Sequence, residues 1–283
     1  MSKTESKPPL VFLKIGGSLL GDKRKQTSFR RAVVTRLGGE IRSALKSLPG
    51  MRLLLAHGAA GWGHHPAKKY RTREGLPGGG GWRGVYETRR GMIDLNRRVL
   101  DSLATAGLHP VLVPPSAGVV AAEGRVATWS LDVIRQILAQ GQVPLIHGDV
   151  VLDSDKGFTI LSTEELFDYL VPRLRPSRVI LACDVEGVYL DADAPRSKRN
   201  IVSVIDRTNI ATIRKILAPS RSSRRSKVKD VTGGMAAKVE RMFELVSRRR
   251  RLQARIVSGL KPGAVRVALL GEGVGTAICG TMT

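Results

Sequence analysis

Short runs of apolar residues alternate along the chain with longer segments in which apolar residues recur every three or four positions. The short runs predict strands at residues 10–13, 51–56, 110–113, 143–146, 179–182 and 254–257. The longer segments predict helices at residues 29–48, 92–106, 131–139, 164–174 and 235–248. Strands that are apolar throughout are covered on both faces, and their alternation with helices indicates parallel pairing through crossover helices. The pattern therefore predicts an α/β fold, a three-layer αβα sandwich with an open, mostly parallel central sheet.

The chain shows no internal repeat and no long linker. Residues 1–8 are polar and end in proline, which predicts a flexible N-terminus. The clearest loops are the glycine-rich residues 77–81 and the basic residues 219–229, and both are too short to separate domains. We therefore expect a single domain over residues 9–283, with two lobes.

Composition narrows the class of protein. Hydrophobic residues make up 42% of the 283 residues, enough for a buried core, so a disordered tail is excluded. Cys183 and Cys279 are too few for a disulfide framework, and a reduced, cytoplasmic protein is expected. No apolar run reaches the roughly 18 residues that span a bilayer, and the N-terminus lacks the apolar stretch of a secretory leader.

The chain is strongly basic. It has 47 Lys and Arg against 24 Asp and Glu, a net charge of +23, so its substrate or partner is expected to be anionic. Residues 221–225 and 248–251 are arginine-rich and could bind nucleic acid, but they carry no interleaved aromatic residues and no known nucleic-acid motif. A solvated basic surface that attracts small anions is the favoured interpretation.

Candidate anion-binding residues lie next to two of the predicted elements, after the first strand and at the start of the last helix. Ligands of open α/β sheets bind beyond the carboxyl ends of the strands. The first strand runs into the sequence KIGGS, which places Lys14 beside Gly16, Gly17 and Ser18, although such a turn could be structural only. Gly233 and Gly234 precede the helix that carries Lys238, and a glycine pair at a helix start can hold phosphate. Neither the Walker A pattern nor GxGxxG after the first strand is present, which excludes those two nucleotide-binding motifs.

Histidines and acids stand at other strand ends. The second strand continues into HGAAGWGHH, residues 57–65, where a histidine could bond a phosphate, bind a metal or be satisfied in the core. Metal binding is disfavoured because no cysteine or carboxylate cluster lies at ligand spacing. Asp149 and Asp184 could bond a ribose or cap a turn. Phosphoryl transfer needs mainly positioning and positive charge, which this combination could supply.

These segments resemble the amino acid kinase superfamily and, within it, the isopentenyl phosphate kinases. The resemblance is collinear from about residue 10 to the end of the chain. It includes KIGGS with Asp22-Lys23, residues 57–70, residues 143–149, residues 184–188, DVTGGM at residues 230–235 with Lys238, and residues 271–276. Residues 57–70 and the DVTGGM element are its most specific parts.

The resemblance implies ATP-dependent phosphorylation of isopentenyl phosphate to isopentenyl diphosphate, in isoprenoid biosynthesis. Lys14 and Lys238 would contact the ATP phosphates and the transferred group, and Lys23 would stabilise the transition state. The remaining nucleotide contacts would come from Gly16, Gly17, Ser18, Ala60, Asp184, Gly187, Gly233 and Gly234. His64 would bond the acceptor phosphate, and the other acceptor contacts would come from Ala59, Gly63 and Thr163.

The resemblance also implies an acceptor-binding lobe up to about residue 175, a nucleotide-binding lobe after it, and a homodimer. Mg²⁺ is expected to arrive with ATP, and no residues are assigned as dedicated metal ligands. One alternative is a kinase of another small phosphate or phosphonate, such as a fosfomycin kinase. A more remote alternative is a nucleic-acid-binding protein on an inactive kinase fold.

The sequence departs from the family pattern in two turns. Ala59 and Ala60 stand where glycines are usual, which strains the backbone if the turn needs a positive φ angle. Residues 162–165 read STEE where SGDD is usual, and an aspartate there orients the lysines in the superfamily. We expect Glu165 to take that catalytic role through hydrogen bonds to the lysines.

Overall fold

The computed structural model describes residues 8–22, 24–76, 78, 81–190, 200–218, 234–249 and 251–280. Its main sheet has eight strands in the order β10-β12-β11-β9-β1-β2-β6-β3. Their bounds are β1 Leu10–Ile15, β2 Arg52–His57, β3 Val111–Leu112, β6 Pro144–His147, β9 Arg178–Cys183, β10 Val204–Ile205, β11 Gln253–Ser258 and β12 Thr276–Cys279. All neighbours pair in parallel except β11 and β12, which are antiparallel. The mostly parallel sheet predicted from the apolar runs is confirmed.

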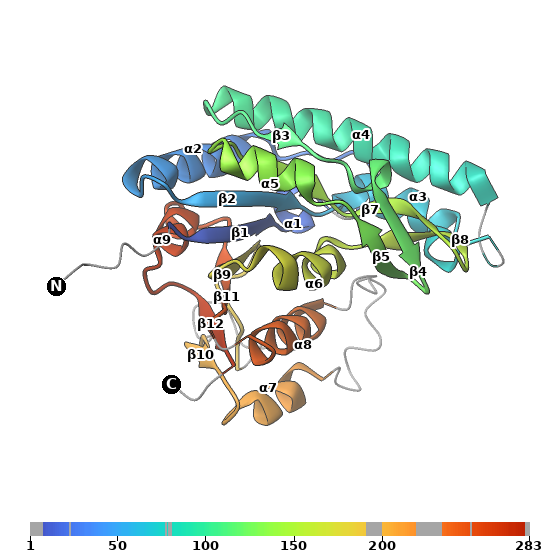
Figure 1. Ribbon diagram of the computed structural model, residues 1–283. Coiled ribbons are helices and arrows are strands. Elements are labelled where there is room, and N and C mark those ends of the chain that lie inside the picture. The colour runs from blue at the N-terminus through green and yellow to red at the C-terminus, as the bar shows by residue number, and fades with distance from the viewer. Residues whose placement is uncertain are drawn as a thin grey trace.

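Helices cover both faces of this sheet (Figure 1). One face packs against α2 (Arg31–Ser47), α4 (Gly81–Thr105) and α9 (Ala264–Leu270). The other face packs against α5 (Asp132–Ala139), α6 (Thr163–Leu174) and α8 (Gly234–Ser247), and α7 (Ile210–Leu217) lies against α8. Because side chains alternate along a strand, Phe12 enters one core cluster and Leu13 the other. This arrangement confirms the three-layer sandwich.

A second, four-stranded sheet was not predicted. It comprises β4 (Val119–Ala122), β5 (Arg125–Trp129), β7 (Asp149–Asp153) and β8 (Gly157–Leu161), in the order β5-β4-β7-β8. Its outer surface includes Val120 and Leu152, which pair with each other and are both exposed. β5, with the sequence RVATW, mixes polar and apolar residues and gives no clear strand signal, whereas β4 (VVAA) and β7 (DVVLD) do contain short apolar runs that were not predicted as strands.

Helices near the carboxyl ends of β1 and β2 also differ from expectation. α4 begins at Gly81 rather than residue 92, because its first turns combine glycines with the exposed Trp82 and Tyr86 and show little apolar spacing. α3 (Ala60–Lys69) forms where a turn was expected, from a sequence of small residues, histidines and Pro66. A short helix α1 (Gly17–Leu20) and two 3-10 turns, η1 (Thr72–Glu74) and η2 (Pro115–Ala117), complete the elements used below.

Two predicted loops have different outcomes. Of the glycine-rich segment 77–81 the structure describes Gly78, in a turn, and Gly81, which begins α4, whereas residues 77, 79 and 80 and the basic segment 219–229 lie outside the described residues. Within the part of the chain that the structure describes, no helix combines the length and apolarity needed to cross a membrane.

Candidate active site

A cavity of about 680 Å³ opens at the carboxyl ends of the central strands. The strands β1, β2 and β9 end there, and each is followed by residues that line the cavity. These include Lys14 near the end of β1 with Gly16, Gly17 and Ser18 after it, Gly58 and Ala59 after β2, and Cys183 and Asp184 at the end of β9. Residues that are distant in the sequence thus meet in one cavity because the parallel strands all end at the same edge.

The turns after β1 and β2 touch through their backbones. A Cβ atom on Gly17 would lie 2.8 Å from the amide nitrogen of Ala60, and one on Gly58 would lie 2.8 Å from the amide nitrogen of Gly17. Only glycine fits such an approach. Ala60 has a φ of 47°, so the alanine that replaces a glycine does sit in the left-handed region. Ala60 is fully buried beside Gly17 and does not itself line the cavity.

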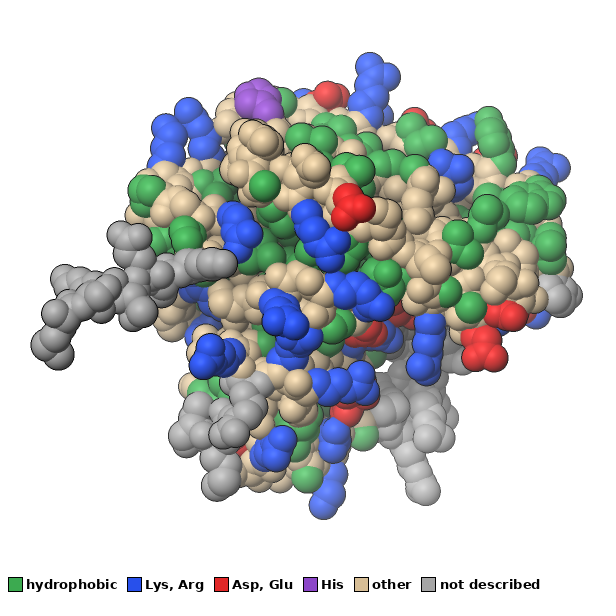
Figure 2. Space-filling model, in the orientation of Figure 1, with side chains coloured by type: hydrophobic (Ala, Val, Ile, Leu, Met, Phe, Trp, Pro, Cys, Tyr) green, Lys and Arg blue, Asp and Glu red, His purple; other side chains and the backbone are tan. Residues whose placement is uncertain are grey.

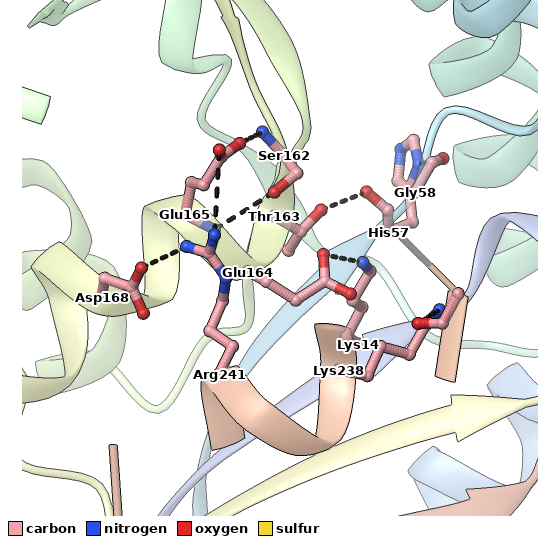
Figure 3. A network of polar contacts seen from close by, with 11 residues as sticks. Lys14, His57, Gly58, Ser162, Thr163, Glu164, Glu165, Asp168, Lys238 and Arg241 are labelled. Carbon is pink, nitrogen blue, oxygen red and sulfur yellow. Dashed lines mark hydrogen bonds and ion pairs between the residues drawn. The ribbon is translucent and has the colours of Figure 1, made fainter. Parts of the chain in front are cut away.

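Lys14 pairs with Glu164, not with Glu165 (Figure 3). Both partners are 8% exposed, so this is a buried ion pair at the cavity wall. Burial alone would raise the pKa of Glu164, but the charge and hydrogen bond of Lys14, together with the charge of Lys238, hold that pKa below its ordinary value. The carboxyl group is therefore ionised at neutral pH and can orient Lys14.

The prediction that Glu165 binds Lys14 is wrong by one residue. Ser162 is the N-cap of α6, and its side chain accepts a hydrogen bond from the backbone of Glu165, while the Glu165 carboxylate accepts one of 2.6 Å from the Ser162 amide. This reciprocal capping box turns the third helical residue back over the helix end. The second residue, Glu164, is left to face the cavity.

We expect Glu164→Gln to lower kcat about tenfold, because Lys14 loses the charge that orients it. Breaking a buried pair also lowers stability, so thermal melting should be followed in parallel. Glu164→Asp, which restores the charge on a shorter side chain, should recover part of the rate. Equal rates for Glu164→Gln and wild type would show that the pair is only structural.

Lys238 approaches the same cavity from α8. Its amino group lies 3.2 Å from the carbonyl oxygen of Gly234, the first residue of the helix, which has a φ of 64°. Lys238, Gly234 and Met235 all line the cavity opposite the β1 turn. Two of the predicted nucleotide and catalytic residues, Lys23 and Gly233, lie outside the described residues.

Asp184 and Gly187 follow β9 but lie in different surroundings. The Ser18 hydroxyl donates a 2.9 Å hydrogen bond to Asp184, which links the turn after β1 to the end of β9 at the cavity. Gly187 instead packs against Thr276, where a Cβ atom would lie 2.6 Å from the threonine hydroxyl oxygen. Gly187 is not among the residues that line the cavity, so its predicted nucleotide contact has no support from the cavity lining.

The other end of the cavity combines polar groups with an apolar wall. Gly63 and His64 line it from α3, with Ala59 before the helix. Met92 of α4 and Ile160 and Leu161 of β8 supply apolar surface. Thr163 also lines the cavity, and its hydroxyl donates to the carbonyl oxygen of His57. Gly63 leaves room for Met92, since a Cβ atom there would lie 2.7 Å from the methionine sulfur.

Sequence reasoning missed further cations of the cavity. Lys68 is in α3, and Arg71 and Arg73 lie in or beside η1, and all three line the cavity. Lys68 stands inside the segment that carries the family resemblance, so it could have been considered. Arg73 had no such signal, because its position depends on how η1 packs against β8.

A buried histidine pair lies behind the cavity. The rings of His57 and His147 stack with centroids 5.4 Å apart, and the His57 Nε2 atom lies 2.9 Å from the side-chain oxygen of Asn96. Burial, with the nearby His147, lowers the pKa of His57 to about 4 despite its hydrogen bonds. His57 is therefore neutral in the native protein at pH 5 to 7.

This neutral histidine predicts a pH-dependent stability. Between pH 6.5 and 4 the unfolded chain binds a proton at His57 that the native protein does not, so stability falls as the pH is lowered. The contribution at pH 4.5 relative to pH 7 is about 2–3 kcal/mol. Urea unfolding of wild type and His57→Gln at both pH values should show a smaller pH difference in the variant. The same pH difference in both proteins would contradict the assignment.

Comparison with known proteins agrees with this geometry. The model of the amino acid kinase family matches residues 9–258. The chain belongs to the amino acid kinase family. It is 33% identical to an isopentenyl phosphate kinase of Methanothermobacter thermautotrophicus over 96% of this chain and 99% of the relative. It is 31% identical to an isopentenyl phosphate kinase of Methanocaldococcus jannaschii, over 95% and 98% of the two chains.

A solved structure supports the same relationship. The fold superposes on a crystal structure described as isopentenyl phosphate kinase with a TM-score of 0.76 and 30% identity. The superposition covers 95% of this chain and 99% of that chain. The family resemblance inferred from KIGGS, residues 57–70 and DVTGGM is thereby confirmed.

Proposed function

We propose that this protein transfers the γ-phosphoryl group of ATP to isopentenyl phosphate and forms isopentenyl diphosphate. One observation carries the proposal: a single cavity holds Lys14, Lys238 and His64 together with the apolar wall of Met92, Ile160 and Leu161. Such a cavity matches an acceptor with a phosphate at one end and a short hydrocarbon chain at the other. The relatives of nearly equal length that are named isopentenyl phosphate kinases support the same substrate.

The lysines would act on the charge that moves during transfer. An oxygen of the acceptor phosphate forms a bond to the γ-phosphorus while the bond to the ADP oxygen breaks, so negative charge builds on the leaving oxygen. Lys14, oriented by Glu164, and Lys238 would neutralise this charge, with Lys23 as a third cation. The turn of Gly16, Gly17 and Ser18, with Asp184, Gly233 and Gly234, would hold the nucleotide.

The acceptor phosphate would lie against α3. His64 would donate a hydrogen bond to it, and the backbones of Ala59, Gly63 and Thr163 would complete its surroundings. The acceptor oxygen already carries negative charge near neutral pH, so no protein group needs to remove a proton from it. His64 therefore binds and orients the acceptor and does not act as a base.

Mg²⁺ would enter with the nucleotide. The described residues contain no group of three or more His, Cys, Asp or Glu side chains that could hold a metal ion. Mg²⁺ in kinases is typically held by few protein carboxylates together with substrate phosphates, and bound there it would neutralise phosphate charge.

The proposal also covers the two lobes, the oligomeric state, the location and the surface charge of the protein. Residues up to about 175 would form the acceptor side and the later residues the nucleotide side, in a homodimeric, cytoplasmic enzyme. Lys and Arg side chains are spread over the face shown in Figure 2. A net charge of +23 would attract both anionic substrates and raise their rate of encounter with the cavity.

An acceptor screen with ATP and Mg²⁺ tests the proposal. Isopentenyl phosphate, fosfomycin, uridine monophosphate and acetylglutamate would be compared by kcat/KM, with the product identified by mass. Isopentenyl phosphate is expected to be the preferred acceptor. Preference for fosfomycin would assign a phosphonate kinase instead, and absence of turnover with every acceptor would remove the kinase assignment.

A further inference from the structure

Glu165 joins three segments of the chain at the edge of the cavity. One of its carboxylate oxygens, Oε2, accepts the hydrogen bond from the Ser162 amide within α6. The other, Oε1, pairs with Arg73, and it also lies 3.9 Å from a guanidinium nitrogen of Arg241. The Glu165 side chain is only 15% exposed, although it lies near the protein surface. Both oxygens are thus engaged, one in the helix cap and one in ion pairs.

The two arginines come from different elements of the chain. Arg73 belongs to η1, follows α3, and lines the cavity together with His64 of that helix. Arg241 belongs to α8, three residues after Lys238, so the two side chains leave the helix on neighbouring positions of one side. Arg241 also pairs with Asp168 of α6, which holds it beside Glu165 (Figure 3).

A small side cavity of about 270 Å³ lies at this junction. It is lined by Arg73, Glu165, Lys238 and Arg241, with Ser162, Glu164 and Ala237. In the first turn of α6, two neighbouring carboxylates therefore point to different partners. Glu164 contacts Lys14 inside the main cavity, while Glu165 contacts the arginines at its edge.

We propose that Glu165 is a positioning residue that ties η1, on the acceptor side, to α8, which carries Lys238. The inference rests on the proposed function for the identity of the acceptor. A single carboxylate restrains both Arg73 and Arg241. Loss of its charge should therefore loosen the acceptor-side turn and the helix of Lys238 together. The expected consequence is a weaker acceptor site and slower transfer in the same variant.

The helix cap and the ion pairs can be separated by one substitution. Glutamine also serves at the third position of a capping box, so Glu165→Gln keeps the hydrogen bond from Ser162 and loses the charge. Partly exposed ion pairs add little to stability, so the melting temperature should change little. A kinetic effect of Glu165→Gln would then report on positioning rather than on the integrity of α6.

The test uses three single variants, Glu165→Gln, Arg73→Gln and Arg241→Gln. It also uses two double variants, in which Glu165→Gln is combined with one of the arginine changes. Glu165→Gln should raise the acceptor KM about three- to tenfold and lower kcat by a similar factor. Arg73→Gln should affect mainly the acceptor KM, and Arg241→Gln mainly kcat and the Kd for ATP. In each double variant, kcat and the acceptor KM should change no more than in the single variant with the larger effect, because both substitutions break the same ion pair.

The matched control is Glu240→Gln. Glu240 pairs with Arg214 of α7 through two contacts, so this variant removes an ion pair from α8 outside the junction. Its kinetic constants should equal those of wild type. Additive losses in the doubles, an effect of Glu165→Gln confined to the melting temperature, or an equal kinetic loss in Glu240→Gln would each overturn the positioning role.

The proposed function and the positioning role fail in different ways. A wild-type protein that does not phosphorylate isopentenyl phosphate contradicts the function only. In that case, the Kd for ATP, measured without an acceptor in wild type and in the variants, tests the positioning role of Glu165. Both Glu165→Gln and Arg241→Gln should weaken ATP binding, the latter at least as much because it also loses the pair with Asp168, and their double should show no further loss. Additive weakening, or unchanged ATP affinity in both singles, would overturn it.

Discussion

Replacing Lys14 or Lys238 by alanine is expected to lower turnover about 10²–10³-fold, because in the proposed function each amino group would face phosphate oxygens whose charge changes during transfer. Both side chains line the same cavity, from β1 and from α8. Single-turnover rates with saturating ATP would separate this loss from an effect on nucleotide binding. The melting temperature should change far less than the rate.

Two further variants make this result interpretable. Lys14→Ala leaves Glu164 buried without its partner, so the double variant Lys14→Ala with Glu164→Gln shows whether an uncompensated carboxylate adds to the loss. Lys215→Ala removes an exposed lysine from α7 and should leave turnover unchanged. Normal turnover in both Lys14→Ala and Lys238→Ala would contradict phosphoryl transfer in this cavity.

The second large effect is expected at His64, with His65 as its natural control. A histidine that donates to an acceptor phosphate makes a charge-assisted hydrogen bond of about 1.5–3 kcal/mol, so His64→Ala should lower kcat/KM for isopentenyl phosphate about 10- to 150-fold. The Kd for ATP should change little. His64→Gln should retain part of the activity, because an amide can still donate a hydrogen bond without the charge.

His65 is adjacent to His64 in the sequence but does not line the cavity, so it serves as a control. His64 lines the cavity and His65 does not, because adjacent residues of α3 point about 100° apart around the helix. His65→Ala should therefore be close to wild type. If His65→Ala is inactive and His64→Ala is active, the assignment of residues in this segment is wrong by one position. The proposed acceptor site is then wrong as well.

The central strands could be predicted because of where they lie. A strand buried on both faces must be apolar at nearly every position, and the runs at residues 10–13, 53–56 and 179–182 show this without any knowledge of the fold. Strand β5 of the second sheet and helix α3 lack such a signal. β5 has one buried residue, Trp129, and α3 begins in a run of small residues that also suits a turn.

The chemistry of the cavity was only partly accessible from the chain. Glycine turns after strands, with lysines beside them, indicated an anion site, and parallel strands explain why such turns meet. The choice between Glu164 and Glu165 did have a local signal that was not used. Ser162 and Glu165 stand at the S-x-x-E spacing of a capping box, which turns Glu165 back over the helix end and leaves Glu164 to face the cavity.

Residue types and their spacing were thus sufficient for the α/β class and the strand ends that carry the site, because burial and backbone geometry act locally on each strand and turn. The family came from the resemblance of KIGGS, residues 57–70 and DVTGGM to known sequences. The pairing of Lys14 with Glu164, 150 positions apart, and the meeting of Arg73 and Arg241 at Glu165 came only from the tertiary structure. Such contacts depend on how helices pack across the sheet, and a side chain's partner among distant charges is not encoded in its neighbours along the chain.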